Sequence, residues 1–285
     1  MGDALDRRVT GGVIVNGELK EFAEASLSVL DIGMQRGYGC FEALRSYAGR
    51  PFRSGAHYDR LVASADMLGI SIPGGDLVEG WIADRSAAGG DCVVRVLVTG
   101  GLDPFRPGDD SRVIVYAEPL PDRSGPMRVL PRPAPWHPDG EFSELTGAKT
   151  LSYGPNLAAS LAAQRAGFDD ALLIGRSGSV LEGPTYGVAW ITDGKIETPA
   201  LDLGILASIT RVAMLEVAAG AGIVATEGRY PLDRMLAADE VFALSTVKEI
   251  MPITAVGDRT WEAGPITARL ARGFTALVSR ELASQ

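Results

Sequence analysis

Lysine is rare in this chain, and one of its lysines has neighbours unlike those of the others. Only four of the 27 basic residues are lysines, and the rest are arginines. Lys20, Lys195 and Lys248 follow turns or strands, which is typical of solvated charges. Lys149 lies among small and apolar residues in LTGAKTLSYGPN, just before an expected helix. An amine attacks carbonyls once it loses its proton, which a guanidinium does not do, so Lys149 is the candidate nucleophile. The alternative is an exposed loop lysine.

A lysine that bonds to a carbonyl brings pyridoxal phosphate (PLP) into consideration as cofactor. PLP needs a carboxylate at its ring nitrogen, and backbone amides at a helix start plus a fixed cation at its phosphate. The chain offers Glu182 at a strand end, the opening of an expected helix at Ser208, Ile209 and Thr210, the strand-end pair Ser245 and Thr246, and Arg60 as cation. Each of these has an ordinary structural alternative. Glu182 could be a turn residue, Ser208 a helix N-cap, Ser245 and Thr246 simple strand-end hydroxyls, and Arg60 a solvated charge.

Composition excludes several classes of protein. The formal charge of −9 argues against a generic nucleic-acid binder. No apolar run approaches the roughly 20 residues of a membrane-spanning helix. The first residues, MGDALDRRVTGG, lack a secretory signal, so a cytoplasmic location is expected. Cys40 and Cys92 lie in apolar runs and are expected to be buried thiols. With only two histidines, His57 and His137, a multi-histidine metal site is excluded, and no metal is expected.

The first part of the chain predicts a small α/β domain. Asn16-Gly17 between apolar stretches indicates a hairpin. Apolar residues at helical spacing predict a helix from Ser54, its expected N-cap, to Gly69, and a second helix over 76–87. Strands are expected over 91–99, with Val94, Val96 and Val98 on one face, and over 111–118. We place this domain at 1–119, a proline-rich linker at 120–126 and a larger domain at 127–285.

The larger domain alternates helices and strands in the same way. A helix is expected over 155–167, and another begins near Ser208. A C-terminal helix is expected from the apolar stripe Ile266, Leu270, Phe274 and Leu277. Strands are expected at DALLIG, SVLEG, YGVAWI, EVFALST and EIMPITAV.

Six segments in order resemble one known family. They are DIGMQRGYGCFEALRSY, HYDRLVASADML, GAKTLSY, VLEGPTYGVAWITDGKIETP, ILASITR and EVFALSTVKEIMPI. Together they resemble the class IV aminotransferases, the fold-type IV PLP enzymes. This family includes branched-chain aminotransferases, D-amino acid aminotransferases, (R)-amine transaminases and aminodeoxychorismate lyase. The resemblance runs from about residue 12 to the C-terminal helix. It implies an α/β (α+β) fold, with a small N-terminal domain and a larger domain around a strand-rich pseudo-barrel.

The resemblance also implies roles for individual residues. Lys149 becomes the Schiff-base lysine and proton shuttle, Glu182 the partner of the pyridinium nitrogen, and Arg60 a phosphate ligand. The remaining cofactor contacts implied are Tyr153, Leu206, Ser208, Ile209, Thr210, Ser245 and Thr246. Family members are homodimers or larger, so a homodimer is implied, with loops of the first domain completing the neighbouring subunit's site.

Departures from the family pattern bear on the substrate. The strand that ends in T-R-G in D-amino acid aminotransferases and in the lyase ends here in Thr99-Gly100-Gly101, so the usual carboxylate-binding arginine is absent. Arg95, the lone charge on an apolar strand face, and Arg36, in the loop that reaches the neighbouring site, are the candidate replacements. An internal salt bridge and a surface charge are their respective alternatives.

The favoured function is transamination between a D-amino acid and a 2-oxo acid such as 2-oxoglutarate or pyruvate, with side activity on (R)-amines. The short spacing from Lys149 to Tyr153 resembles the D-amino acid and lyase branches. The alternatives are a branched-chain L-amino acid aminotransferase, an aminodeoxychorismate-type lyase, and a protein that binds PLP or a metabolite without turnover.

Overall fold

The chain divides into two compact units. The computed structural model describes residues 9–122 and 125–284. The first unit holds the described residues up to Asp122 together with Ala148–Tyr153, and the second holds the remainder. Ala148–Tyr153 lies within the range 127–285 predicted for the larger domain. By its contacts, this short segment with the candidate lysine belongs to the first unit.

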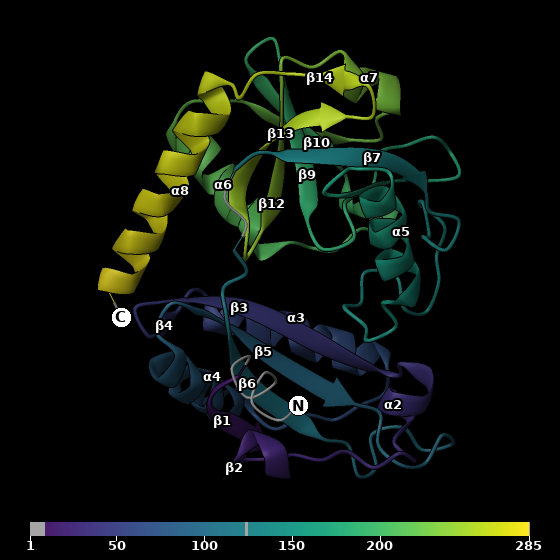
Figure 1. Ribbon diagram of the computed structural model, residues 1–285, viewed down its shortest axis with the longest axis vertical. Coiled ribbons are helices and arrows are strands. Elements are labelled where there is room, and N and C mark those ends of the chain that lie inside the picture. Colours follow the sequence, from purple (N-terminus) through teal and green to yellow (C-terminus); the bar gives the residue numbers. More distant parts are fainter. Residues whose placement is uncertain (1–8, 123–124, 285) are drawn as a thin grey trace. The chain divides into compact units, whose positions relative to one another are not determined.

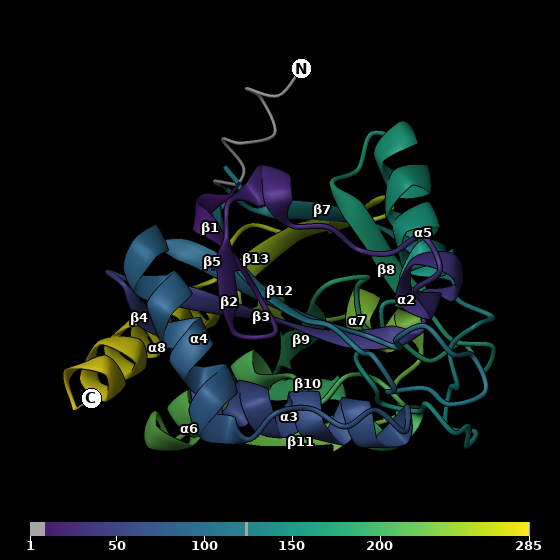
Figure 2. The same cartoon turned by 90° about the horizontal axis from the view of Figure 1, so that it is seen from below.

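The first unit is an antiparallel sheet of six strands in the order β2-β1-β6-β5-β3-β4, with α3 and α4 packed against it (Figures 1 and 2). Its elements are β1 (Thr10–Val15), β2 (Glu18–Lys20), the 3-10 turn η1 (Phe22–Glu24), α2 (Ile32–Arg36), β3 (Gly39–Tyr47), β4 (Arg50–Pro51), α3 (Ser54–Met67), α4 (Gly75–Gly89), β5 (Cys92–Thr99) and β6 (Val113–Pro119). The predicted hairpin is β1–β2, and Asn16 and Gly17 both have positive φ at its turn.

Alternation along the strands builds the core of this unit. Val94, Val96 and Val98 are fully buried, as predicted, in one cluster with Leu44 of β3 and Leu61 of α3. The opposite face of these two strands carries a mixture of apolar, aromatic and charged side chains, such as Val93, Phe41 and Arg95. The helices α3 and α4 therefore pack on one face of β3 and β5, and the side chains of α3 that point to the sheet meet this face.

The start of α3 differs from the prediction. Ser54 is the first helical residue, and the N-cap is Arg53, which has a φ of 54°. The Ser54 hydroxyl donates to Glu79 of α4 at 2.7 Å instead of capping its own helix. A tertiary hydrogen bond has replaced the local one, so the predicted N-cap is wrong by one residue.

The second unit is a mixed sheet with the strand order β11-β10-β9-β12-β13-β7-β8, in which β14 pairs with β13 (Figure 1). Its elements are β7 (Met127–Pro133), α5 (Gly154–Arg165), β8 (Asp170–Ile174), β9 (Gly187–Thr192), β10 (Lys195–Pro199), the 3-10 turn η2 (Leu201–Leu203), α6 (Ile209–Gly220), β11 (Ala225–Gly228), α7 (Leu232–Leu236), β12 (Glu240–Ser245), β13 (Glu249–Val256), β14 (Arg259–Thr260) and α8 (Pro265–Ala283).

The predicted strand SVLEG is not a regular strand. Leu181 and Glu182 exchange backbone hydrogen bonds with Leu173 of β8, but Val180 donates to Tyr230 instead. Because these bonds go to two different partners, no continuous ladder forms. The irregular segment delivers the Glu182 side chain beside β8.

The C-terminal helix α8 packs its apolar stripe on the second sheet. Leu270, Phe274 and Leu277 are buried, and α8 contacts β12, β13 and α6. The buried Glu240 carboxylate accepts the amides of Ile266 and Thr267, which caps the start of α8. Across the described ranges, none of the helices is long and apolar enough to span a membrane.

Candidate cofactor-binding and active site

Lys149 lies in an extended segment that runs along the start of β3. Its carbonyl accepts the amide of Phe41 at 3.0 Å, and Leu151 donates its amide to Gly39 at 2.8 Å. The Lys149 amide donates to the Ser64 hydroxyl of α3 at 3.1 Å. Its Nζ lies 4.3 Å from the centre of the Phe41 ring. Both backbone groups of Lys149 are therefore fixed, and its amine is directed along an aromatic face.

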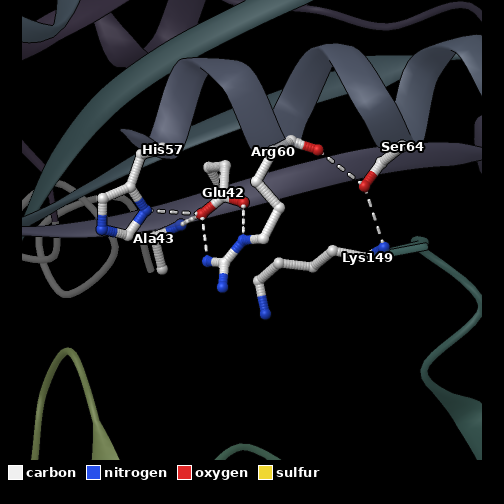
Figure 3. A network of polar contacts seen from close by, with 6 residues as sticks. All are labelled: Glu42, Ala43, His57, Arg60, Ser64 and Lys149. Atoms are coloured by element: carbon white, nitrogen blue, oxygen red, sulfur yellow. Dashed lines mark hydrogen bonds and ion pairs between the residues drawn. The ribbon is translucent and has the colours of Figure 1, made fainter. Parts of the chain in front are cut away.

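A buried ion pair lies next to Lys149 (Figure 3). The Glu42 side chain, 1% exposed, accepts Nε of Arg60 at 2.7 Å and Nη2 at 2.8 Å. His57 Nδ1 lies 2.7 Å from the same carboxylate. The hydroxyl of Ser64 donates to the Arg60 carbonyl and accepts the Lys149 amide. We call Glu42, His57, Arg60, Ser64 and Lys149 the lysine cluster.

The charges of the lysine cluster follow from its burial. Burial alone would raise the pKa of the Glu42 carboxyl, but the Arg60 guanidinium, and after it His57, favours the ionised form and lowers this pKa to about 2. Burial lowers the pKa of His57, against the opposing effect of Glu42. At neutral pH the pair is therefore Glu42 carboxylate with Arg60 guanidinium, and a neutral His57 donates its Nδ1–H.

The two cysteines are buried thiols, as predicted. Burial, with a contribution from Glu42, raises the pKa of Cys40 to about 12. Burial also raises the pKa of Cys92. Neither thiol is activated as a nucleophile. Across the described ranges, no group of three or more His, Cys, Asp and Glu residues is arranged to hold a metal.

Glu182, in the second unit, lies between a backbone amide and an imidazole. The Leu206 amide lies 3.3 and 3.4 Å from its two oxygens. His137 Nε2 lies 3.4 Å from Oε1. We call His137, Glu182 and Leu206 the glutamate cluster.

The start of α6 has the geometry expected of an anion site. Ser208 is the N-cap, and its hydroxyl accepts the Arg211 amide at 3.2 Å. Ile209 and Thr210, both buried, form the first turn, where backbone amides have no partner within the helix. Together with the positive end of the helix dipole, these amides favour a phosphate.

The turn between β12 and β13 contains a buried lysine. Ser245 accepts the Lys248 amide at 3.0 Å, so Ser245 and Thr246 lie at a tight turn. Lys248 is only 8% exposed, and its Nζ lies over the Tyr186 ring and 3.5 Å from the Thr185 hydroxyl. The prediction of a solvated Lys248 is wrong, because the turn folds the side chain back onto residues 185–186.

The two arginines proposed for the substrate carboxylate differ in environment. Arg36 is exposed at the end of α2, whose N-cap Asp31 also accepts the Thr99 hydroxyl at 2.7 Å. Arg95 forms a salt bridge with Glu118 at 2.6 Å, and about a third of its side chain is exposed. Arg95 therefore has an anionic partner within the chain, which is the internal salt bridge given as its alternative.

Sequence reasoning missed Glu42, Ser64 and the contacts of the two histidines. His57 and His137 were considered only as metal ligands, and Glu42 is an ordinary member of an alternating strand. One signal was present: His57, Arg60 and Ser64 are spaced i, i+3 and i+7, which places three polar residues on one face of α3. A polar stripe at this spacing indicates a partner on the strand that the helix covers.

Neutralising Glu42 is expected to destabilise the protein. In Glu42→Gln, Arg60 stays buried without its counter-charge, which costs on the order of 3 kcal/mol at pH 7. Because folding lowers the Glu42 pKa from 4.5 to about 2, the stabilisation is complete above pH 4.5 and is lost as the pH falls towards 2. Urea unfolding of both proteins from pH 7 to pH 3 should therefore show their difference shrinking with acid.

Glu118→Gln is the matched control. It removes a carboxylate from a partly exposed pair in the same sheet, where a loss of at most about 1 kcal/mol is expected. Equal losses for the two variants, or a Glu42→Gln loss that does not change with pH, would contradict the assignment.

Comparison with known proteins identifies the family. Residues 39–256 match the family model described as "Amino-transferase class IV". A D-alanine aminotransferase of Listeria monocytogenes is 32% identical over 94% of this chain and 96% of its own. A putative branched-chain-amino-acid aminotransferase of Methanocaldococcus jannaschii is 30% identical over 92% of this chain and 94% of its own.

The fold is shared with a solved transaminase. The fold IV-transaminase of Curtobacterium pusillum has a TM-score of 0.83 at 29% identity, covering 91% of this chain and 93% of its own. The family and fold inferred from the six sequence segments are thus confirmed. The chain belongs to the class IV aminotransferases, the PLP-dependent aminotransferases of fold type IV.

Proposed function

We propose that this aminotransferase moves an amino group from a D-amino acid to a 2-oxo acid such as 2-oxoglutarate or pyruvate, with side activity on (R)-amines. The observation that carries the transamination chemistry is Lys149, whose backbone is fixed by both of its groups beside the Glu42–Arg60 pair. Its Nζ lies 4.3 Å from the centre of the Phe41 ring. It meets the requirement for a nucleophile that attacks a carbonyl carbon.

The chain has the donor set that PLP requires. Lys149 would hold the aldehyde carbon of the cofactor, and Glu182 its ring nitrogen. The amides of Ile209 and Thr210, the Arg60 guanidinium and the donors of Ser208, Ser245 and Thr246 would hold the phosphate. Tyr153 and Leu206 would contact the ring and its oxygen. When bound, PLP supplies an electron sink for the charge left at the substrate α-carbon.

The side chains then have distinct tasks. The Glu182 carboxylate keeps a proton on the ring nitrogen, which maintains the sink. The Lys149 amine would take the proton from the substrate α-carbon and deliver it to C4′ of the cofactor, and it would move a proton in the opposite direction in the second half-reaction. Arg60 is a suitable phosphate ligand because Glu42 fixes the plane of its guanidinium before any anion arrives.

The substrate proposal depends on the carboxylate site. No arginine lies at Thr99-Gly100-Gly101, and Thr99 instead binds Asp31 at the start of α2, the helix that ends in Arg36. We propose Arg36 as the main substrate-carboxylate ligand. Arg95, whose charge Glu118 already balances, is a secondary candidate.

Two relatives support different substrates. The Listeria monocytogenes relative is a D-alanine aminotransferase, which agrees with the proposal. The Methanocaldococcus jannaschii relative favours the second candidate, a branched-chain L-amino acid aminotransferase. The short Lys149–Tyr153 spacing and the absence of an aromatic residue at Arg36 favour the first.

We further propose a homodimer whose sites are completed by the segment that carries Arg36. Val29, Leu30 and Met34 are 75%, 62% and 68% exposed on this segment. Adjacent large apolar side chains at the surface are typical of an interface. A second copy of the chain would cover them and would receive Arg36 in its own site.

Replacing Lys149 tests the chemistry. Lys149→Ala and Lys149→Arg should lower kcat by at least about 10³-fold, because neither side chain can attack a carbonyl or shuttle the α-proton. The purified protein with PLP should absorb in the visible range, and this absorbance should be bleached by an amino donor only when Lys149 is present. Full transamination by Lys149→Ala would exclude the assigned role.

A substrate panel tests the substrate class. Steady-state rates with D-alanine, D-glutamate, L-leucine and an (R)-amine, each against 2-oxoglutarate, should give the highest kcat/KM for a D-amino acid. Activity with L-leucine alone would overturn the proposal in favour of the branched-chain function.

The carboxylate ligands are tested with the same panel. Arg36→Ala should raise KM about tenfold or more for amino acids while leaving KM for the (R)-amine nearly unchanged, because only the former carries a carboxylate. Arg95→Ala should have a smaller effect. Equal changes for acids and amines would assign Arg36 a structural role.

The dimer is tested by light scattering. Wild-type protein should have twice the mass of the chain, and Met34→Glu should shift the population towards a single chain, because burying a carboxylate at the interface is unfavourable. Leu77→Glu, an exposed apolar position on α4 of the same unit, is the control and should stay dimeric. A wild-type monomer would refute the proposal.

A further inference from the structure

We propose that His137 is a positioning residue, whose imidazole holds Glu182 in the orientation that serves the cofactor's ring nitrogen. This inference rests on the role of Glu182 proposed above. It concerns a histidine that the donor set for PLP does not use. His137 and Glu182 lie 45 residues apart in sequence but in the same unit.

A tight turn after β7 fixes the position of His137. The His137 amide donates to the Ala134 carbonyl at 3.0 Å. The Ala134 amide donates to Ile174 at the end of β8 at 2.8 Å, and Ala134 is buried. The preceding residue, Trp136, donates its indole N–H to Asn156 of α5 at 3.0 Å. These hydrogen bonds fix the backbone of His137 relative to the end of β8.

Strand β8 also fixes the backbone of Glu182. The Glu182 carbonyl accepts the Leu173 amide at 2.8 Å, and Leu173 directly precedes Ile174, which accepts the Ala134 amide. His137 Nε2 reaches Oε1 of Glu182 at 3.4 Å, and the Leu206 amide reaches both oxygens at 3.3 and 3.4 Å. The carboxylate is thus approached by two donors from two different loops.

The burial of His137 leaves one ring nitrogen to make a hydrogen bond. The side chain is 9% exposed, and within the described part of the chain its Nδ1 has no hydrogen-bond partner. An Nδ1–H would be a buried donor without an acceptor, whereas an Nδ1 without hydrogen leaves only a lone pair unmatched. The geometry therefore favours a ring with its hydrogen on Nε2, directed at Glu182.

A hydrogen bond from Nε2 of His137 restricts the rotation of the Glu182 carboxylate. It reaches only one of the two carboxylate oxygens. The oxygens of a carboxylate accept several hydrogen bonds, so contacts with His137 and Leu206 leave capacity for the ring N–H.

The test compares variants by their affinity for PLP, measured by absorbance titration of the protein stripped of cofactor. His137→Phe keeps a ring and removes the donor, and His137→Gln keeps a neutral donor. We expect His137→Phe to raise the dissociation constant of PLP about tenfold, and His137→Gln to stay within about twofold of wild type. His137→Leu, which also lacks a donor, replaces the phenylalanine variant if that variant does not fold.

A double-mutant cycle separates positioning from general structural support. Glu182→Gln should weaken PLP binding by itself, and His137→Phe should have no further effect in that background. Wild-type affinity in His137→Phe, or the same loss with and without Glu182, would overturn the inference. Unchanged affinity in Glu182→Gln would remove Glu182 from the ring nitrogen, which overturns its proposed role and this inference together. Loss in Glu182→Gln without loss in His137→Phe overturns the inference alone.

Discussion

The first unit is organised around one buried charge, the Glu42 carboxylate. Burying an ionised carboxylate is tolerated only when it is matched by charge and hydrogen bonds. Arg60 supplies the charge through two of its nitrogens, and His57 supplies a further hydrogen bond. Because both residues lie on α3, the pair fixes that helix against β3. Ser64, one turn further along the helix, then holds the amide of Lys149. The backbone of Lys149, the proposed nucleophile, is therefore bonded both to the helix that neutralises Glu42 and to the start of β3.

The second unit holds its carboxylate in the opposite way. Glu182 contacts a backbone amide and the imidazole of His137, and among the described residues no arginine or lysine forms a salt bridge with it. Glu42, in contrast, is paired with an arginine of its own unit. This difference agrees with the proposed role of Glu182 as the partner of the cofactor's ring nitrogen. Nearby, the amides at the start of α6 leave a positive helix end for an anion.

Local chemistry was readable from the sequence, and pairings over long distances were not. Lys149 could be identified because nearly all other basic residues of the chain are arginines. Ser208 could be identified as a helix N-cap because a serine precedes an apolar run of helical period. The strands β5, β6, β9, β12 and β13 followed from alternation or from continuous apolar runs. Each of these signals lies within a few neighbouring residues.

The errors share one physical cause. The Glu118 partner of Arg95 was not identified, and Lys248 was expected to be solvated. The reason is that Glu118 lies 23 residues from Arg95, and Tyr186 lies 62 residues from Lys248. Ser54 was assigned to cap its own helix, but its hydroxyl binds Glu79. Glu42 was not identified as buried, because its partners lie on α3 and the alternation of its own strand does not indicate them. Whether a charged side chain is buried depends on the fold, because the residues that contact it lie far away in the sequence.

A crystal structure of the protein with PLP and a non-reactive carboxylic acid bound would test the central claim most directly. The account predicts that Lys149 Nζ is bonded to the cofactor, that Glu182 meets the ring nitrogen, and that the Glu42–Arg60 pair remains intact while Arg60 contacts the phosphate. A cofactor attached elsewhere, or an Arg60 that leaves Glu42 to bind the phosphate, would contradict the claim that the buried Glu42 charge sets the position of the site.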